Sequence, residues 1–241
     1  LAELVAQTDI PAGVINVVPA ERAVSQYLVS HPDIDKVSFT GSTIAGSKIG
    51  AICGEHIKRC SLELGGKSPN IVFEDSDIEA AVMGVISGIF AATGQTCIAG
   101  SRLLVQESIH DMFVAKLVKI AEQAKIGDPM DSETHVGPVT TEPQYNKILD
   151  YIQIAKNDGA KCVLGGRPYF GPGAKGDRFV EPTIFTGVNN RMRIAQEEVF
   201  GPILSVIPFK TEDDAISIGN DIMFGLAAGV WTNDIGRALR M

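Results

Sequence analysis

Residues 92–102 read Ala-Thr-Gly-Gln-Thr-Cys-Ile-Ala-Gly-Ser-Arg and place one cysteine, Cys97, in a short polar loop. A helix is predicted before this loop, because apolar residues recur at a three-and-four spacing from Ile78 to Phe90. The aliphatic run at 103–105 is typical of a strand. We therefore expect Cys97 to lie on a helix-to-strand connection, where a rigid scaffold can hold a reactive side chain near solvent.

The sequence also predicts where this helix begins and ends. Ser76 and Glu79 stand three residues apart, as in a capping box, and Asp75 and Asp77 suit the positive end of the helix dipole. Gly94 is well placed to end the helix, since glycine tolerates the left-handed conformation common at helix ends. The predicted helix thus starts after Ser76 and ends near Gly94.

Cys97 has two interpretations. A free cysteine is often a small buried apolar residue with no chemical role. The residues around it, Gly94, Gln95, Thr96 and Gly100, form instead a polar loop that exposes its backbone and hides a thiol poorly. This neighbourhood favours a nucleophilic thiol, whose activation must come from other parts of the chain.

A second candidate lies in residues 61–70, Ser-Leu-Glu-Leu-Gly-Gly-Lys-Ser-Pro-Asn. Glu63 stands between Leu62 and Leu64 at a predicted strand end and should point away from both leucines. A carboxylate on an apolar strand end is expected to be partly desolvated, which makes it a candidate general base. The alternative is a strand-end glutamate that faces water.

A third motif joins a predicted strand ending at Phe39 and Thr40 to Gly41 and Ser42, with Ser42 as the expected N-cap of the next helix. The free N–H groups and positive dipole end of a helix suit a pyrophosphate. The alternative is an ordinary helix cap, and the usual dinucleotide fingerprint Gly-x-Gly-x-x-Gly is absent.

Composition narrows the classes of partner. A net charge of −8 over 241 residues argues against nucleic acid or an anionic membrane as a partner. No apolar stretch approaches the roughly twenty residues of a membrane span, and no signal peptide opens the chain. The four cysteines and four histidines show neither metal-ligand spacing nor a disulfide framework. We expect no metal site and a cytoplasmic location.

Alternating helical and extended patterns predict an α/β protein with a parallel sheet covered on both faces. Helices are expected at 1–7, 20–30, 43–53, 78–90, 108–124, 142–157 and 212–218. Strands are expected at 14–18, 36–40, 59–64, 68–73, 103–105, 161–164, 183–185, 203–209 and 227–231. A glycine- and proline-rich stretch at 165–177 should be an exposed excursion. Residues 1–66 form a Rossmann-like portion, and residues 67–241 form a second α/β domain.

Four phrases together resemble the aldehyde dehydrogenase superfamily, in the family's order and across essentially the whole chain. They are Phe-Thr-Gly-Ser-Thr at 39–43, Leu-Glu-Leu-Gly-Gly-Lys-Ser-Pro at 62–69, Gly-Gln-Thr-Cys-Ile-Ala-Gly-Ser-Arg at 94–102 and Glu-Glu-Val-Phe-Gly-Pro at 197–202. The resemblance implies that residues 1–66 are the C-terminal part of a dinucleotide-binding domain and that residues 67–241 are an incomplete catalytic domain. The chain is then an internal piece of a longer protein.

The same resemblance implies oxidation of an aldehyde to a carboxylate by a nicotinamide cofactor, NAD or alternatively NADP. Cys97 would attack the aldehyde carbonyl, and the thiohemiacetal would become a thioester. Glu63 would activate the water that hydrolyses the thioester. The CoA-acylating branch of the family usually lacks this glutamate, so Glu63 favours the hydrolytic branch.

The resemblance also implies cofactor-binding residues. Glu198 would bond the nicotinamide ribose, with Phe200 packed near the ring; the alternative for Glu198 is an ordinary loop carboxylate. Gly41 and Ser42 would lie along the nicotinamide and the pyrophosphate. Gly65 would allow the chain to approach closely beside Glu63.

Some expected family features do not occur in these residues. The family's Pro-Trp-Asn segment and its adenosine-binding lysine and acidic residue should lie upstream, and the segment closing the substrate tunnel downstream. We therefore expect this piece alone to be inactive, and the full-length enzyme to be a homo-oligomer, dimer or tetramer. Two alternatives stay open: a non-catalytic truncated pseudoenzyme or interaction module, and a cysteine hydrolase that acts on esters without cofactor.

Overall fold

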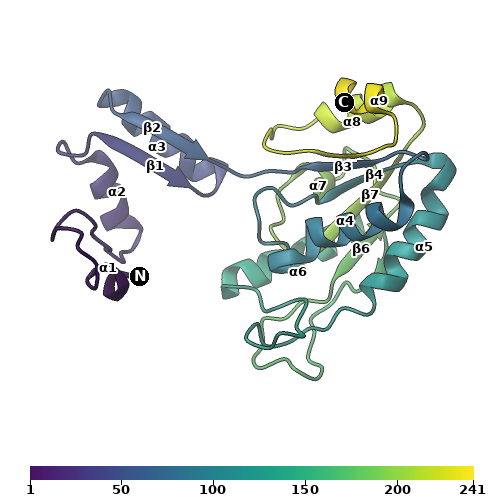
Figure 1. Ribbon diagram of the computed structural model, residues 1–241, viewed down its shortest axis with the longest axis horizontal. Helices are drawn as coiled ribbons and strands as arrows, with labels where there is room; N and C mark the ends of the chain where they lie inside the picture. Colours follow the sequence, from purple (N-terminus) through teal and green to yellow (C-terminus); the bar gives the residue numbers. More distant parts are fainter. The chain divides into compact units, whose positions relative to one another are not determined.

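The computed structural model describes all 241 residues as two compact units, Leu1–Leu64 and Gly65–Met241 (Figure 1). The sequence placed the domain boundary after residue 66. Both units combine helices with parallel strands, as the alternating pattern predicted.

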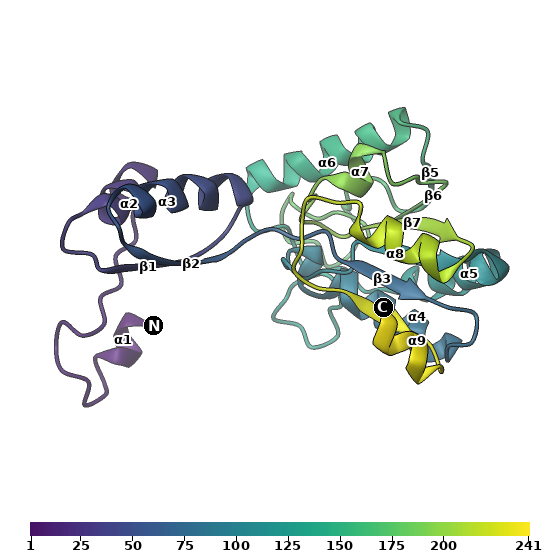
Figure 2. The same ribbon diagram turned by 90° about the horizontal axis from the view of Figure 1, so that it is seen from above.

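The first unit is a helix-covered pair of strands. Strands β1 (Lys36–Thr40) and β2 (Arg59–Glu63) pair in parallel, and helix α3 (Thr43–Glu55) connects them and lies along the pair (Figure 2). Helices α1 (Ala2–Val5) and α2 (Arg22–Ser30) precede them. A parallel pair requires such a crossover, which is why the strand–helix–strand pattern at 36–64 was predictable.

The predicted buried strand at 14–18 is wrong. These residues form no strand, and Val14 and Val18 are 65% and 68% exposed. A strand needs a neighbour to accept its backbone hydrogen bonds, and β1 and β2 of this unit pair only with each other. The apolar run gave the right residue types for a strand but could not supply a partner.

The second unit is built on a six-stranded sheet in the order β5-β6-β7-β4-β3-β8. Its strands are β3 (Pro69–Val72), β4 (Arg102–Gln106), β5 (Lys161–Leu164), β6 (Thr183–Thr186), β7 (Ile203–Phe209) and β8 (Gly229–Trp231). All neighbours are parallel except the edge pair β5 and β6. The chain returns from β5 to β6 without a helix between them, so it re-enters the sheet antiparallel.

Helices cover both faces of this sheet, as Figure 2 shows. They are α4 (Ile78–Phe90), α5 (His110–Ala121), α6 (Glu142–Asn157), α7 (Arg193–Gln196), α8 (Glu212–Asn220) and α9 (Ile235–Arg240). Two apolar clusters fill the layers, and neighbouring strand residues face opposite ways. Leu103 packs with Val85 of α4 and Phe113 of α5, whereas Leu104 packs with Ile148 of α6 and Ala215 of α8.

The start of α4 corrects the predicted capping box. Asp77 is the N-cap, and its carboxylate accepts a hydrogen bond from the Ala80 N–H at 3.1 Å. Ser76 instead donates its hydroxyl to the Phe73 carbonyl at 2.8 Å. The helix also ends at Phe90, earlier than Gly94, and a 3₁₀ turn spans Ala91–Gly94. Asp and Ser are both good caps, so sequence alone could not choose between adjacent ones.

Candidate functional site

The loop that carries Cys97 is shaped by three consecutive left-handed residues. Ala92, Thr93 and Gly94 have φ angles of 49°, 58° and 68°, which reverse the chain after α4. The Thr93 hydroxyl donates to the Gly137 carbonyl at 3.1 Å, which anchors the turn outside its own helix. Cys97 follows as a free, half-buried thiol, neither enclosed in the core nor fully exposed.

A second loop, residues 197–202, packs against the first. Phe200 holds a φ of 59°, unusual for an aromatic residue, and Gln144 of α6 donates its amide to the Val199 and Phe200 carbonyls at 2.8 and 2.9 Å. A β-carbon on Gly94 would collide with the Gly201 carbonyl. These two loops, far apart in sequence, are therefore packed so closely that no side chain fits at Gly94.

The glycine pair Gly65-Gly66 joins both loops to the start of β3. The Gly66 N–H donates to Glu198 Oε1 at 3.0 Å, and a β-carbon on Gly65 would lie 2.5 Å from Glu198 Oε2. A β-carbon on Gly66 would collide with the Cys97 carbonyl oxygen. Between Gly66, Gly94 and Glu198 remains a cavity of about 10 Å³, room for one water at most. The backbone of Cys97 and the carboxylate of Glu198 are thus fixed on adjacent glycines.

Arg102, the last residue of the cysteine motif, ties this glycine pair to the sheet. Its fully buried guanidinium donates to the Lys67 carbonyl at 2.9 Å and to the Ile218 and Gly219 carbonyls at the end of α8, at 2.9 and 2.8 Å. It also donates to Asn190 Oδ1 at 3.0 Å. Burial lowers the pKa of Arg102 to about 10, so the group stays charged at neutral pH. Its planar fork meets acceptors from three separate segments.

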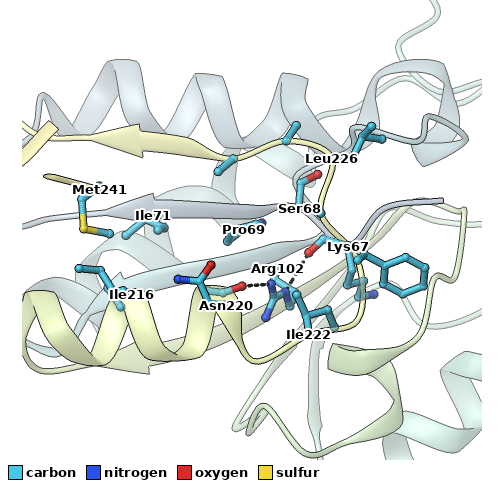
Figure 3. A pocket seen from close by; sticks show the side chains of 16 residues that line it. Lys67, Ser68, Pro69, Ile71, Arg102, Ile216, Asn220, Ile222, Leu226 and Met241 are labelled. Atoms are coloured by element: carbon cyan, nitrogen blue, oxygen red, sulfur yellow. Dashed lines mark hydrogen bonds between the residues drawn. The ribbon is translucent and has the colours of Figure 1, made fainter. Parts of the chain in front are cut away.

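Lys67 is the other buried basic residue, and unlike Arg102 its side chain has no hydrogen-bond partner. Its side chain is 3% exposed and makes no hydrogen bond or ion pair. The pKa of Lys67 is lowered to about 7, chiefly by burial and then by the nearby Arg102 charge, while Glu198 acts in the opposite direction. The residue lines a pocket of about 140 Å³ beside β3 and α8 (Figure 3).

The remaining predicted residues, Gly41, Ser42 and Glu63, lie in the first unit. Ser42 is the N-cap of α3, as predicted, and accepts the Ala45 N–H at 3.2 Å. The Gly41 N–H donates to the Glu63 carbonyl at 3.0 Å, so both stand at the same strand ends. The first helical amide, at Thr43, has no acceptor within the helix.

The first unit by itself does not desolvate Glu63, so the predicted partial desolvation stays a prediction. Its side chain is exposed, while Leu62 and Leu64 are half-buried. Gly50 and Gly46 of α3 approach these two leucines, so the helix covers their face of β2 and leaves the opposite face, with Glu63, open within this unit. The alternation of side chains was predicted correctly, but one helix cannot cover both faces of a strand pair.

Comparison with known proteins agrees with this architecture. The family model described as "Aldehyde dehydrogenase family" matches residues 1–241. The chain belongs to this family. It is 47% identical over 241 residues to a betaine aldehyde dehydrogenase of Mesorhizobium japonicum, covering 100% of this chain and 50% of that protein. It is 46% identical to a peroxisomal aminoaldehyde dehydrogenase 1 of Pisum sativum, covering 48% of that protein.

Solved structures confirm the α/β fold class. An indole-3-acetaldehyde dehydrogenase in complex with NAD+ superposes with a TM-score of 0.95 at 46% identity, over 99% of this chain and 48% of that one. A Staphylococcus aureus betaine aldehyde dehydrogenase in complex with NAD+ also gives 0.95, at 40% identity and the same coverage. The chain spans about half the length of these relatives. Its helices all lack the combination of length and apolar character needed to cross a membrane.

Arg102 and Lys67 were not predicted to have a role, although both stand inside the family motifs. Arg102 directly precedes the strand predicted at 103–105 and opens the observed β4, where a fully buried charged residue is unusual. Lys67 follows a glycine pair and precedes a serine, a pattern typical of an exposed turn. Only the position of Arg102 directly before an apolar strand gave a signal of burial.

Lys67 should make stability depend on pH. Its folded pKa of about 7 lies below the ordinary lysine value, so between about pH 7 and pH 10 the unfolded chain binds the extra proton. The free energy of unfolding should therefore rise with pH across this range by a few kcal/mol, on the order of 1.4 per unit of separation. The variant Lys67→Met, which has no proton to bind, should lack this rise and be more stable at pH 7.

Denaturant titrations of both proteins from pH 6 to pH 10 measure this effect as a difference, in which contributions from other groups cancel. A difference that is largest near pH 7 and vanishes toward pH 10 is expected. Parallel curves for the two proteins would show that the Lys67 amine titrates normally.

Proposed function

We propose that this chain supplies the nucleophile, the water-activating carboxylate and part of the cofactor site of an NAD-dependent aldehyde dehydrogenase. The substrate is a small aldehyde, and the product is the carboxylate. Family membership supports this proposal. The observation that carries it is the close packing of the Cys97 backbone and the Glu198 carboxylate against Gly65 and Gly66.

In this proposal Cys97 acts as the nucleophile. Its sulfur adds to the aldehyde carbonyl carbon, and a thiohemiacetal forms. NAD would supply the hydride acceptor when bound. Loss of the hydride and release of the hydroxyl proton to solvent would leave the carbon as a thioester on Cys97. Glu63 takes a proton from the water that attacks this thioester, which releases the carboxylate and frees the thiol. The half-buried position of Cys97 suits a nucleophile that must meet a substrate and be shielded from bulk water.

The residues of this chain fit parts of the cofactor. Gly41 and Ser42 lie at the start of α3, and the first helical amides offer N–H groups and a positive dipole end to a pyrophosphate. Glu198 keeps acceptor capacity beyond its one bond to Gly66 and can take ribose hydroxyls. Phe200, fixed by its backbone and next to Glu198, is proposed to pack near the nicotinamide.

NAD is proposed over NADP because the relatives of known structure cited above are NAD+ complexes. Gly65 is the last of the proposed cofactor residues. It leaves room for Glu198 at the turn formed by Gly65 and Gly66, called the glycine turn below. We also propose that the full-length protein is a cytoplasmic homo-oligomer, dimer or tetramer. The net charge of −8 supports the absence of nucleic-acid partners, and the four free cysteines are consistent with a reducing compartment.

Replacing Cys97 tests the nucleophile. In the full-length protein, Cys97→Ala should abolish aldehyde-dependent NADH formation, because no carbon–sulfur bond can form. The matched control is Cys162→Ala, which removes a half-buried thiol on the edge strand β5 and should leave turnover nearly unchanged. NADH absorbance measures both. Retained turnover in Cys97→Ala would refute the proposal, and NAD-independent ester hydrolysis without aldehyde oxidation would favour a cysteine hydrolase.

Replacing Glu63 tests the water-activating carboxylate. Glu63→Gln should still form NADH in a burst of about one equivalent per Cys97, because acylation does not need the base. Steady-state turnover should then fall by about 10² to 10⁴, the usual contribution of a positioned base. Glu55→Gln, at the end of α3, serves as the exposed control. Unchanged steady-state turnover in Glu63→Gln would remove Glu63 from the mechanism.

A further inference from the structure

A second candidate nucleophile lies in the pocket beside β3 and α8, apart from Cys97. The pocket has a volume of about 140 Å³. Figure 3 shows Lys67, Ser68 and Arg102 at one end of it and Met241 at the other. Most of the remaining wall is aliphatic or small, and none of the 16 lining residues is acidic. The amine therefore forms no ion pair with the pocket wall, although Glu198 and Glu197 act on it from outside the pocket.

Lys67 is the amine, and its surroundings favour the neutral form. The side chain is 3% exposed and has no hydrogen-bond acceptor, and the charged Arg102 lies next to it. A buried ammonium without a partner is costly, so the proton is held weakly. Its pKa of about 7 leaves a large neutral fraction at neutral pH. Desolvation and an adjacent cation are the two conditions that activate lysines for attack on carbonyl compounds.

Ser68 adds a second unsatisfied group to the same end of the pocket. Its side chain is 4% exposed, and its buried hydroxyl oxygen has no hydrogen-bond partner. Buried hydroxyls are nearly always hydrogen-bonded in proteins, so this unpaired hydroxyl indicates room for a polar ligand atom. A carbonyl oxygen in the pocket could accept a hydrogen bond from this hydroxyl.

We propose that this pocket is a covalent site at which Lys67 condenses with short aliphatic aldehydes. The Lys67 nitrogen lone pair forms a bond to the carbonyl carbon, and the carbonyl oxygen takes up a proton to give a carbinolamine. The carbon–oxygen bond then breaks, the hydroxyl leaves with a proton as water, and a carbon–nitrogen double bond remains. The balance is one amine and one aldehyde to one imine and one water, so no oxidant or cofactor is needed.

The site requires neither Cys97 nor NAD and goes beyond the proposed function. Imine formation in water is reversible, so occupancy should follow the aldehyde concentration. The aliphatic side chains Ile222 and Leu226 and the modest volume select a short, apolar aldehyde over a charged or bulky one.

The test is reductive trapping without NAD. The protein is incubated at pH 7 with butanal and cyanoborohydride, which converts an imine into a stable secondary amine, and butylated peptides are quantified by mass spectrometry. Lys67 should be modified at least tenfold faster than the exposed Lys119 and Lys161. Modification of Lys67 at the same rate as these two lysines or more slowly, or only after unfolding, would overturn the proposal.

Two variants check that the reaction occurs in the pocket. Lys67→Arg, which keeps a cation but forms no stable imine, should lose the fast site and leave the slow modification of Lys119 and Lys161 unchanged. Ile222→Trp, next to Lys67 in Figure 3, should fill the pocket and slow modification of Lys67 at least tenfold. Circular dichroism verifies folding of each variant. Undiminished modification of Lys67 in a folded Ile222→Trp variant would exclude the pocket as the site.

Discussion

The hydrogen bond from the Gly66 N–H to the Glu198 carboxylate is the contact on which the candidate site depends. It joins the loop at 197–202 to the start of β3, and it forms only because Gly65 leaves room for the carboxylate. The opposite side of Gly66 meets the Cys97 carbonyl. Three segments separated by many residues therefore meet at two positions where any side chain would collide, and this restriction fixes the cysteine loop and the acidic loop relative to each other.

Next to this turn lie two buried basic residues, of which one is hydrogen-bonded and the other is not. Arg102 offers its donors to carbonyls and an amide oxygen, so its charge is well solvated by the protein and it positions the chain at Lys67. Lys67 finds no such acceptor, and burial weakens its hold on the proton. A hydrogen-bonded buried charge can act as a structural element, whereas a buried lysine without a partner favours its neutral amine form.

Much of the local structure could be predicted because it depends on short-range patterns. The helix at 142–157 and the strand at 36–40 have the predicted bounds, and Ser42 is the predicted cap. The strand at 14–18 was wrong, because the pairing of a strand depends on elements distant in sequence. The same limit applies to the burial of Lys67 and to that of Arg102, whose guanidinium bonds carbonyls at the end of α8. The catalytic and cofactor roles of the motif residues stay predictions.

The most direct test of the account is the substitution Gly66→Ala, compared with Gly88→Ala in the last turn of α4. An added β-carbon collides with the Cys97 carbonyl at Gly66 but meets nothing closer than 3.7 Å at Gly88. Gly66→Ala should lower the free energy of unfolding by about 1–3 kcal/mol and change the alkylation rate of Cys97 by iodoacetamide severalfold. Gly88→Ala should leave the rate unchanged and stability equal or higher. Equal stability and equal Cys97 reactivity in the two variants would contradict the central role of the glycine turn.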